Sequence, residues 1–150
     1  MLILSFFFLY NCSSDDSPSN NNNQSNEVEI MQIEDQAESG TWRITSYIDS
    51  GQDETNDFNG YNFTFNANGT LMADNGNMTI NGNWSVTDDS NSNDDNPSSD
   101  IDFNIAFASP PEFAELTDDW DVVSHSNTRI VLIDVSGGNG GTDNLVFERN

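Results

Sequence analysis

Apolar and polar residues alternate along much of the chain after residue 40, as expected for strands with one buried face. The clearest run spans residues 101–108, where apolar side chains occupy every second position: Ile101, Phe103, Ile105 and Phe107. A shorter run places Tyr61, Phe63 and Phe65 on one face. Because this period of two recurs in short runs separated by turn residues, the pattern predicts an all-β domain.

Eight short strands are expected, joined mostly by tight turns. They cover residues 41–49, 61–65, 70–73, 78–87, 101–108, 120–124, 129–135 and 144–149. Asn-Gly steps at Asn68-Gly69 and Asn75-Gly76 predict hairpin turns, because both residue types accept a positive φ. Gly82 predicts a bulge or bend, and residues 112–116 a short helical turn. Such an up-and-down meander removes its free edges best by closing into a barrel, with a β-sandwich as the alternative.

The residues before the expected β domain differ from it in amino-acid composition. Leu2 to Tyr10 is apolar except for Ser5, too short to cross a bilayer but typical of a signal-peptide core. Ser13 to Asn26 contains only Ser, Asn, Asp, Gln and Pro, which predicts a flexible spacer. Residues 27–36 fit either a short helix or a lead-in strand, and the pattern does not decide between them.

The chain's one cysteine lies directly after the apolar leader. Leu9-Tyr10-Asn11-Cys12 resembles a bacterial lipobox, although Asn11 replaces the usual small residue and no basic residue precedes Cys12. The resemblance implies cleavage before Cys12, acylation of its thiol, and stable anchoring through several acyl chains. We therefore expect residues 1–11 to be a signal peptide, 12–36 a lipidated, flexible tether and 37–150 the β domain. Ser13-Ser14-Asp15-Asp16 resembles an export signal of Bacteroidota lipoproteins, which indicates the cell envelope and an outer-membrane, surface-exposed location.

Charge narrows the range of partners. The chain has 26 acidic residues against three arginines and no lysine, for a formal charge of −23. This charge argues against nucleic acid and against electrostatic docking on anionic lipid. Ten Phe, three Trp and three Tyr supply enough aromatic mass for a real core. The membrane, through the lipid anchor, is the expected partner, and we expect a monomer.

A second family resemblance concerns the β domain. Gly40-Thr41-Trp42 opens the first expected strand and resembles the G-x-W signature of lipocalins. In that family the tryptophan plugs the closed end of the barrel, and an arginine of the last strand lies across its ring. Arg149 stands in the matching place, and a second Gly-x-Trp occurs at residues 82–84. The resemblance covers residues 40–150 and implies a calycin-type barrel like that of lipocalin-like Flavobacteria lipoproteins, most of which lack an assigned function.

An acidic loop between the expected strands could in principle hold calcium, which takes six to eight oxygen ligands. The spacing of five residues faintly resembles a calcium loop: Asp89, Asn91, Asn93, Asp95 and Asp100. The turn glycine and terminal glutamate of such a loop are missing, so a solvated acidic loop is the favoured interpretation. No metal or other cofactor is expected.

Catalytic chemistry has little support in the sequence. The single histidine, His125, lies between Ser124 and Ser126, but adjacent positions do not build a Ser-His-Asp site and no nucleophile elbow is present. We expect a protein that is not an enzyme, with an uncharacterised hydrolase as the alternative.

Two hypotheses about function remain. In the first, the barrel binds a small apolar ligand, lined by four phenylalanines: Phe63, Phe65, Phe103 and Phe107. In the second, these rings fill the barrel, and the chain is a structural or interaction lipoprotein without a small ligand.

Overall fold

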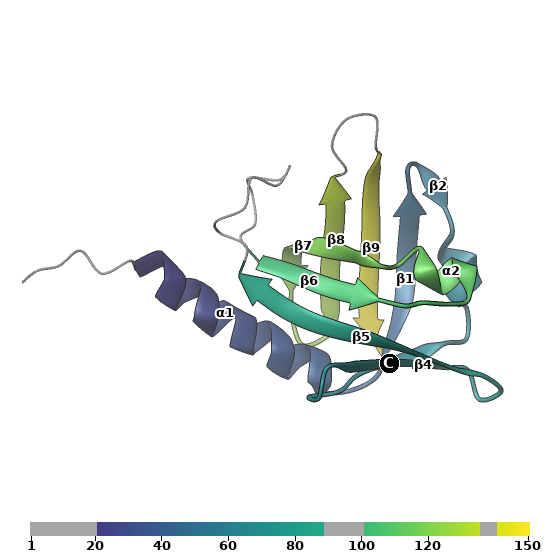
Figure 1. Cartoon of the computed structure of the whole chain (residues 1–150), viewed down its shortest axis with the longest axis horizontal. Coiled ribbons are helices and arrows are strands. Elements are labelled where there is room, and N and C mark those ends of the chain that lie inside the picture. Colours follow the sequence, from purple (N-terminus) through teal and green to yellow (C-terminus); the bar gives the residue numbers. More distant parts are fainter. Residues whose placement is uncertain (1–20, 89–100, 136–140) are drawn as a thin grey trace, which may run out of the picture.

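The computed structural model describes residues 21–88, 101–135 and 141–150. The strands of this part form one antiparallel sheet closed into a barrel (Figure 1). The strands of this described part are β1 (Trp42–Asp49), β2 (Gln52–Asp53), β3 (Asn62–Phe65), β4 (Thr70–Asp74), β5 (Thr79–Asp88), β6 (Ile101–Ala106), β7 (Asp118–His125), β8 (Arg129–Val135) and β9 (Thr142–Arg149). Eight of them form the barrel, and β2 is a short addition at the end of β1. The expected calycin-type barrel is thus confirmed, and the alternative β-sandwich is not the fold.

Strand β1 closes the barrel by pairing on both sides. It pairs with β9 over most of its length but with β3 only at Trp42 opposite Phe63. The β1–β9 register shifts between Ile44 and Ser46. Such a bulge bends a strand and increases its twist, which lets β1 leave β3 and follow β9.

The bulge expected at Gly82 is not present. Leu71 and Gly82 are partners in an unbroken β4–β5 register. A side chain at Gly82 would place its Cβ 2.5 Å from the Ala106 carbonyl oxygen and 2.7 Å from the Phe107 ring. The glycine allows close packing here, because a side chain would meet the Ala106 carbonyl and the Phe107 ring. The two turn glycines match expectation, with φ of 80° at Gly69 and 83° at Gly76.

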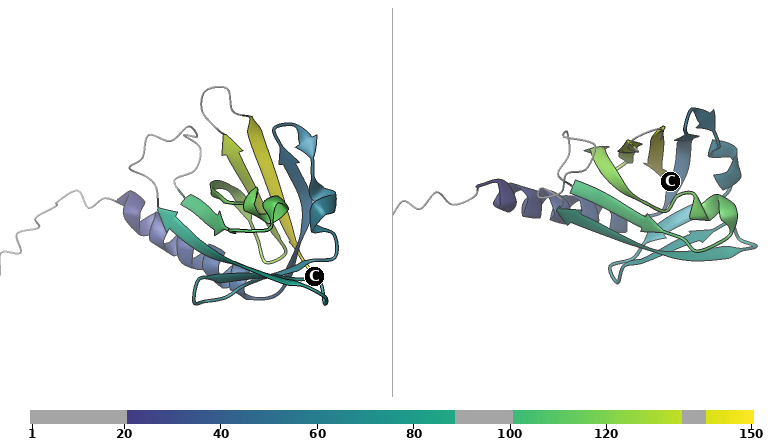
Figure 2. Two further views of the ribbon diagram at one scale, coloured as in Figure 1. Left: turned by 45° about the vertical axis from the view of Figure 1, so that its right-hand side comes forward. Right: turned by 45° about the horizontal axis from the view of Figure 1, so that its top comes forward.

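A long helix, α1 (Asn21–Glu38), precedes the barrel and stays beside β5 in both views of Figure 2. It resolves the alternatives left open for residues 27–36 in favour of a helix. It also corrects the expected spacer, because Asn21–Asn26 is helical. Ile33 and Ala37 are fully buried against the barrel. Since adding residues to a formed helix costs little, this packed C-terminal part can support the polar turns before it.

The barrel has two different ends, because the connections of a meander alternate between them. The β2–β3 connection carries η1 (Thr55–Phe58) and the β6–β7 connection carries α2 (Pro111–Ala114), so both short helices lie at one end. Helix α1 contacts the β7–β8 hairpin at the other end through His125. We call the end with η1 and α2 the mouth of the barrel, and the end with the β7–β8 hairpin its base.

Candidate functional site

The four phenylalanines expected to line a ligand cavity lie in the core. Phe63, Phe65, Phe103 and Phe107 are each between 0% and 4% exposed. They contact other rings rather than open space: Phe65 and Phe103 have ring centroids 5.3 Å apart, and Phe65 and Phe147 are 5.4 Å apart. An eight-stranded barrel has an interior that is either filled by side chains or holds one small ligand, and these rings take part of that space.

Aromatic side chains from the connections cover the mouth. Phe113 of α2 is fully buried, with ring centroids 5.3 Å from Phe58 and 5.0 Å from Tyr61. The Tyr47 hydroxyl donates a 3.0 Å hydrogen bond to the Glu115 carbonyl, tying β1 to the residue after α2. Burial raises the pKa of this hydroxyl, which therefore stays protonated. In the part of the chain that the structure describes, a packed aromatic layer covers the mouth.

Trp42 occupies the base. Its side chain is fully buried, and its Nε1–H donates a 2.8 Å hydrogen bond to the Ala37 carbonyl at the end of α1. Arg149 lies over the ring, with Cζ 5.4 Å from the centroid. A Cβ at Gly40 would lie 3.0 Å from the Arg149 Nε, so the glycine leaves room for the guanidinium. The three residues Gly40, Trp42 and Arg149 thus form one structural unit, which stabilises the helix on the barrel.

His125 joins α1 to the barrel. Its Nδ1 lies 2.9 Å from the Gln36 Oε1, and its Nε2 lies 3.5 Å from the Glu29 Oε1. The Ser126 hydroxyl is used within the β7–β8 turn, where it accepts the Arg129 backbone N–H at 3.1 Å. The described contacts of His125 are therefore those of a structural residue.

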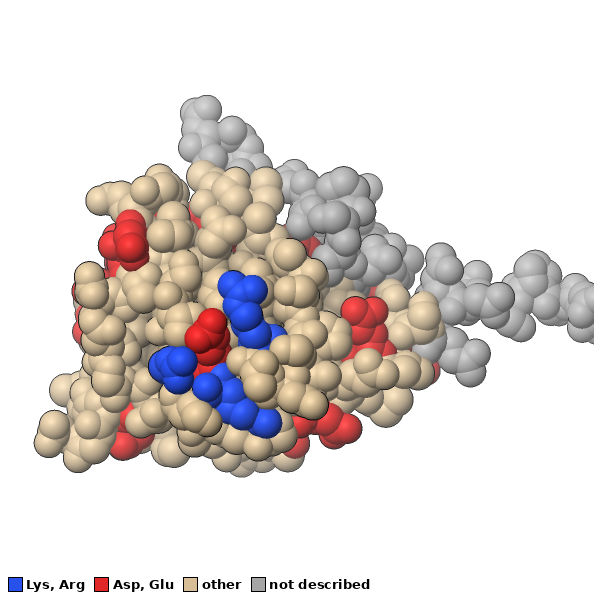
Figure 3. All heavy atoms as spheres, turned by 180° about the vertical axis from the view of Figure 1, so that it is seen from behind, with Lys and Arg blue, Asp and Glu red and all other residues tan. Residues whose placement is uncertain are grey.

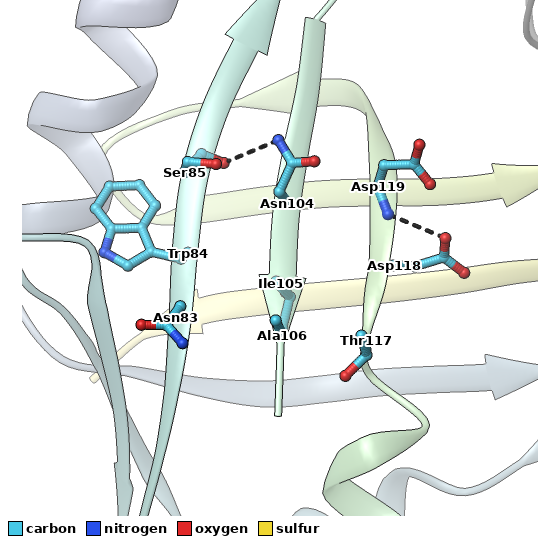
Figure 4. Close-up of a pocket in the computed structure, with 9 residues that line it drawn as sticks. All are labelled: Asn83, Trp84, Ser85, Asn104, Ile105, Ala106, Thr117, Asp118 and Asp119. Atoms are coloured by element: carbon cyan, nitrogen blue, oxygen red, sulfur yellow. Dashed lines mark hydrogen bonds between the residues drawn. The ribbon is translucent and has the colours of Figure 1, made fainter. Parts of the chain in front are cut away.

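A hollow of about 380 Å³ lies on the outside of the barrel, across β5, β6 and β7 (Figure 4). Its lining consists of Asn83, Trp84, Ser85, Asn104, Ile105, Ala106, Thr117, Asp118 and Asp119. Asn83, Ser85 and Ala106 are exposed and alternate with the inward Trp84 and Ile105. Small side chains at Ser85 and Ala106 leave the hollow empty, and longer polar ones surround it. Sequence reasoning missed this site, because polar outward positions occur on any solvated strand.

The carboxylates of the hollow interact with one another. The Asp119 backbone N–H donates a 2.9 Å hydrogen bond to the Asp118 Oδ1. Burial raises the pKa of Asp118 from 3.8 to about 6, and the contact with the Asp119 side chain and the negative charge of Asp134 add to this rise. Ionised Asp118 is therefore held in an unfavourable environment near neutral pH.

Replacing Asp118 with asparagine should stabilise the protein at about pH 7.5, where the wild type carries this unfavourable charge. Because the folded pKa lies above that of the unfolded chain, the folded state binds more protons between about pH 4 and pH 6, and wild-type stability falls as pH rises through that range. With solvent screening, we expect Asp118→Asn to gain about 1 kcal/mol above pH 6 and nothing near pH 3.5.

Urea unfolding at both pH values measures this difference. Asp57→Asn, which removes an exposed carboxylate elsewhere, controls for the change in net charge. Equal gains in stability from both substitutions, or a gain for Asp118→Asn that persists at low pH, would contradict the raised pKa of Asp118.

All three arginines of the chain lie on one face, over β1, β8 and β9 (Figure 3). Arg43 Nη2 lies 3.3 Å and Arg129 Nε 3.7 Å from the carboxylate of Glu148, which stands between them on the sheet. Arg149 covers Trp42 as described. These cations therefore serve contacts within the chain, and the hollow lies on other strands.

The predictions for the leader, Cys12 and the acidic loop concern residues outside the described part of the chain. This holds for all five of the calcium candidates, Asp89, Asn91, Asn93, Asp95 and Asp100. Within residues 21–88, 101–135 and 141–150, no three His, Cys, Asp or Glu side chains form a group that could hold a metal ion. Neither α1 nor the shorter helices of this part is long and apolar enough to cross a lipid bilayer.

An up-and-down antiparallel barrel whose base is plugged by a tryptophan under an arginine defines the class of lipocalin-like proteins. The profile of the family described as "Lipocalin-like domain" matches residues 39–113, half of the chain, and the chain belongs to this family. A solved structure of a DUF4847 family protein from Bacteroides vulgatus is similar in fold, with a TM-score of 0.50 and 20% sequence identity. That match covers 79% of this chain and 97% of the other. No curated protein matches the chain.

Proposed function

We propose that the chain is an exported lipoprotein, acylated at Cys12, that displays a filled lipocalin-like barrel at the cell envelope. Its contacts are made by the outside of the barrel, and the interior carries no apolar ligand. The observation that carries this proposal is the packed aromatic interior, closed by Phe113 at the mouth and by Trp42 at the base. It favours the interaction protein over the ligand carrier.

Among the described residues, packed rings separate the interior from the mouth. An apolar ligand would have to displace Phe58 and Phe113, whose rings lie edge to face with centroids 5.3 Å apart. Burying a phenylalanine side chain contributes about 1.5–3 kcal/mol, and a ligand would have to offset that loss for each displaced ring. The rings therefore compete directly with any apolar guest.

Support for the anchor comes from the sequence. An apolar leader of signal-peptide size ends at Leu9-Tyr10-Asn11-Cys12, and a polar segment of the type used as a spacer follows. Several acyl chains on Cys12 would hold the protein stably on a membrane, and surface exposure on the outer membrane would follow from the Ser-Ser-Asp-Asp segment. The strongly acidic composition keeps such a displayed domain soluble.

Metabolic labelling with an alkynyl fatty acid in a Gram-negative host tests the anchor. We expect the wild type to carry the label and to sediment with membranes, and Cys12→Ser to lose both properties. Ser13→Ala, which changes the neighbouring residue, is the matched control and should keep the label. An unlabelled, soluble wild type made from a gene with an intact leader would overturn the proposal.

A further inference from the structure

We infer that the hollow across β5, β6 and β7 is a binding site for a neutral, polyhydroxylated molecule of the size of a mono- or disaccharide. The inference rests on the proposed function, because it takes the outside of the barrel as the surface that makes contacts. It names the class of ligand that this surface would take.

The strand register builds the site. Ser85 is the cross-strand partner of Asn104, and Asn104 is the partner of Asp119. Directly opposed residues on one face have Cβ atoms about 4.5–5.5 Å apart, so these three side chains form a row of hydroxyl, amide and carboxylate across three strands. Asn83 and Ala106, also cross-strand partners, extend the site along β5 and β6. Rigid strands therefore fix the spacing of the polar groups.

Local hydrogen bonds hold the central amide in place. Asn104 Nδ2 donates to the Thr87 Oγ1 at 2.9 Å and more weakly to the Ser85 carbonyl at 3.5 Å. Figure 4 shows the Asn104 Oδ1 turned the other way, toward the strand that carries Asp119. Thr117 anchors the far edge, because its hydroxyl bonds both the Phe107 N–H at 2.9 Å and the Phe107 carbonyl at 3.0 Å. The polar groups are thus held before a ligand arrives.

The mixture of groups selects the ligand. A sugar hydroxyl both donates and accepts, which suits acceptor-only carboxylates beside amides and a hydroxyl that can also donate. The carboxylates Asp118 and Asp119, on a chain of formal charge −23, disfavour phosphates and other anions. A simple cation would leave the donors of the Asn83 amide and the Ser85 hydroxyl unused. The exposed Ala106 methyl adds apolar surface for the carbon face of a ring.

The size of the hollow agrees with a small ligand. Its volume of about 380 Å³ lies near the lower end of the usual range for ligand pockets, about 300–1,000 Å³. Because the hollow is open to solvent, we expect weak binding whose specificity comes from hydrogen bonds.

The test is calorimetric titration of the full-length protein, solubilised in a detergent without a sugar headgroup. The probes are neutral hexoses, pentoses and N-acetylhexosamines, each free and as the end unit of an oligosaccharide, with uronic acids and hexosamines as charged counterparts. We expect saturable binding of at least one neutral sugar at millimolar concentrations. A free sugar and the end of a longer glycan present the same hydroxyls, and the paired probes distinguish these two sources.

Two substitutions locate the site. Asn104→Ala removes the central amide. Ala106→Leu places a larger side chain in the hollow, at a position that is exposed and therefore tolerates the change. We expect each to weaken sugar binding about tenfold, whereas Asn81→Ala, an exposed asparagine of β5 outside the hollow, should leave it unchanged. Circular dichroism checks that each variant is folded.

Three outcomes would overturn the inference: no binding of any neutral sugar, sugar binding that both hollow variants retain, or binding of amino sugars alone. The labelling of Cys12 is read independently. Loss of sugar binding with the label intact rejects the sugar site alone, and loss of the label rejects the proposed anchoring whatever the titration shows.

Discussion

Replacing Trp42 with alanine is expected to lower the free energy of unfolding by about 3–5 kcal/mol, a large part of the stability of a small domain. The substitution removes a fully buried ring, the 2.8 Å hydrogen bond to the Ala37 carbonyl and the surface on which Arg149 rests. Because that hydrogen bond ties α1 to the base, the helix should also exchange its amide protons faster. Urea unfolding and hydrogen exchange measure the two effects.

Trp42→Phe separates the contributions. It keeps an aromatic ring in the base but cannot donate to Ala37, so the loss should be smaller than for alanine while α1 still loosens. A Trp42→Ala protein within about 1 kcal/mol of the wild type would show that the tryptophan does not support the base.

Replacing Phe113 with alanine should also cost about 3–5 kcal/mol, and in addition it should open the mouth. The Phe113 ring contacts four other aromatic rings, so its removal breaks all four contacts at once. These rings belong to Phe58, Tyr61, Phe63 and Phe107. The cavity left behind is lined by aromatic carbon, and such cavities remain dry and bind small apolar molecules. We therefore expect the variant, unlike the wild type, to bind benzene and to be stabilised by it.

Thermal unfolding with and without benzene measures this gain. Phe113→Leu, which keeps most of the apolar volume, is the control and should lose less stability and gain little binding. Equal stabilisation of wild type and Phe113→Ala by benzene would mean that the mouth is already open.

The sequence predicts the strands well where the pattern is local. The alternation of Ile101, Phe103 and Ile105 requires no knowledge of the rest of the chain, and all three are buried. The turn glycines are equally local, because a positive φ at Gly69 or Gly76 depends on the residue itself.

Features that depend on distant contacts could not be predicted. Helix α1 has a polar first half, and its packing depends on Trp42 and on the hairpin residue His125, which lies 89 positions from Gln36. Gly82 suggested a bulge or bend, but the β4–β5 register is unbroken there and the Phe107 ring lies against the glycine. In each case contacts with residues far along the chain determine the role of the residue, and the local sequence pattern does not predict those contacts.

The candidate site was hidden for a related reason. Phe113 looks like an ordinary residue of a connection until the fold places it over the mouth, so the sequence alone could not choose between a filled and an open barrel.

The hollow on the outside of the barrel depends on strand register. Ser85, Asn104 and Asp119 form a row only through the register of three strands. Outward polar residues carry no mark that distinguishes a binding surface from a solvated one.

The filled interior is tested most directly by titrating the protein with N-phenyl-1-naphthylamine, a neutral apolar probe whose fluorescence rises in apolar surroundings. Energy transfer from the buried Trp42 and Trp120 would report a probe inside the barrel. The account predicts no saturable binding to the wild type. Saturable one-to-one binding to the wild type, with quenching of its tryptophan emission, would show that the barrel carries apolar ligands after all.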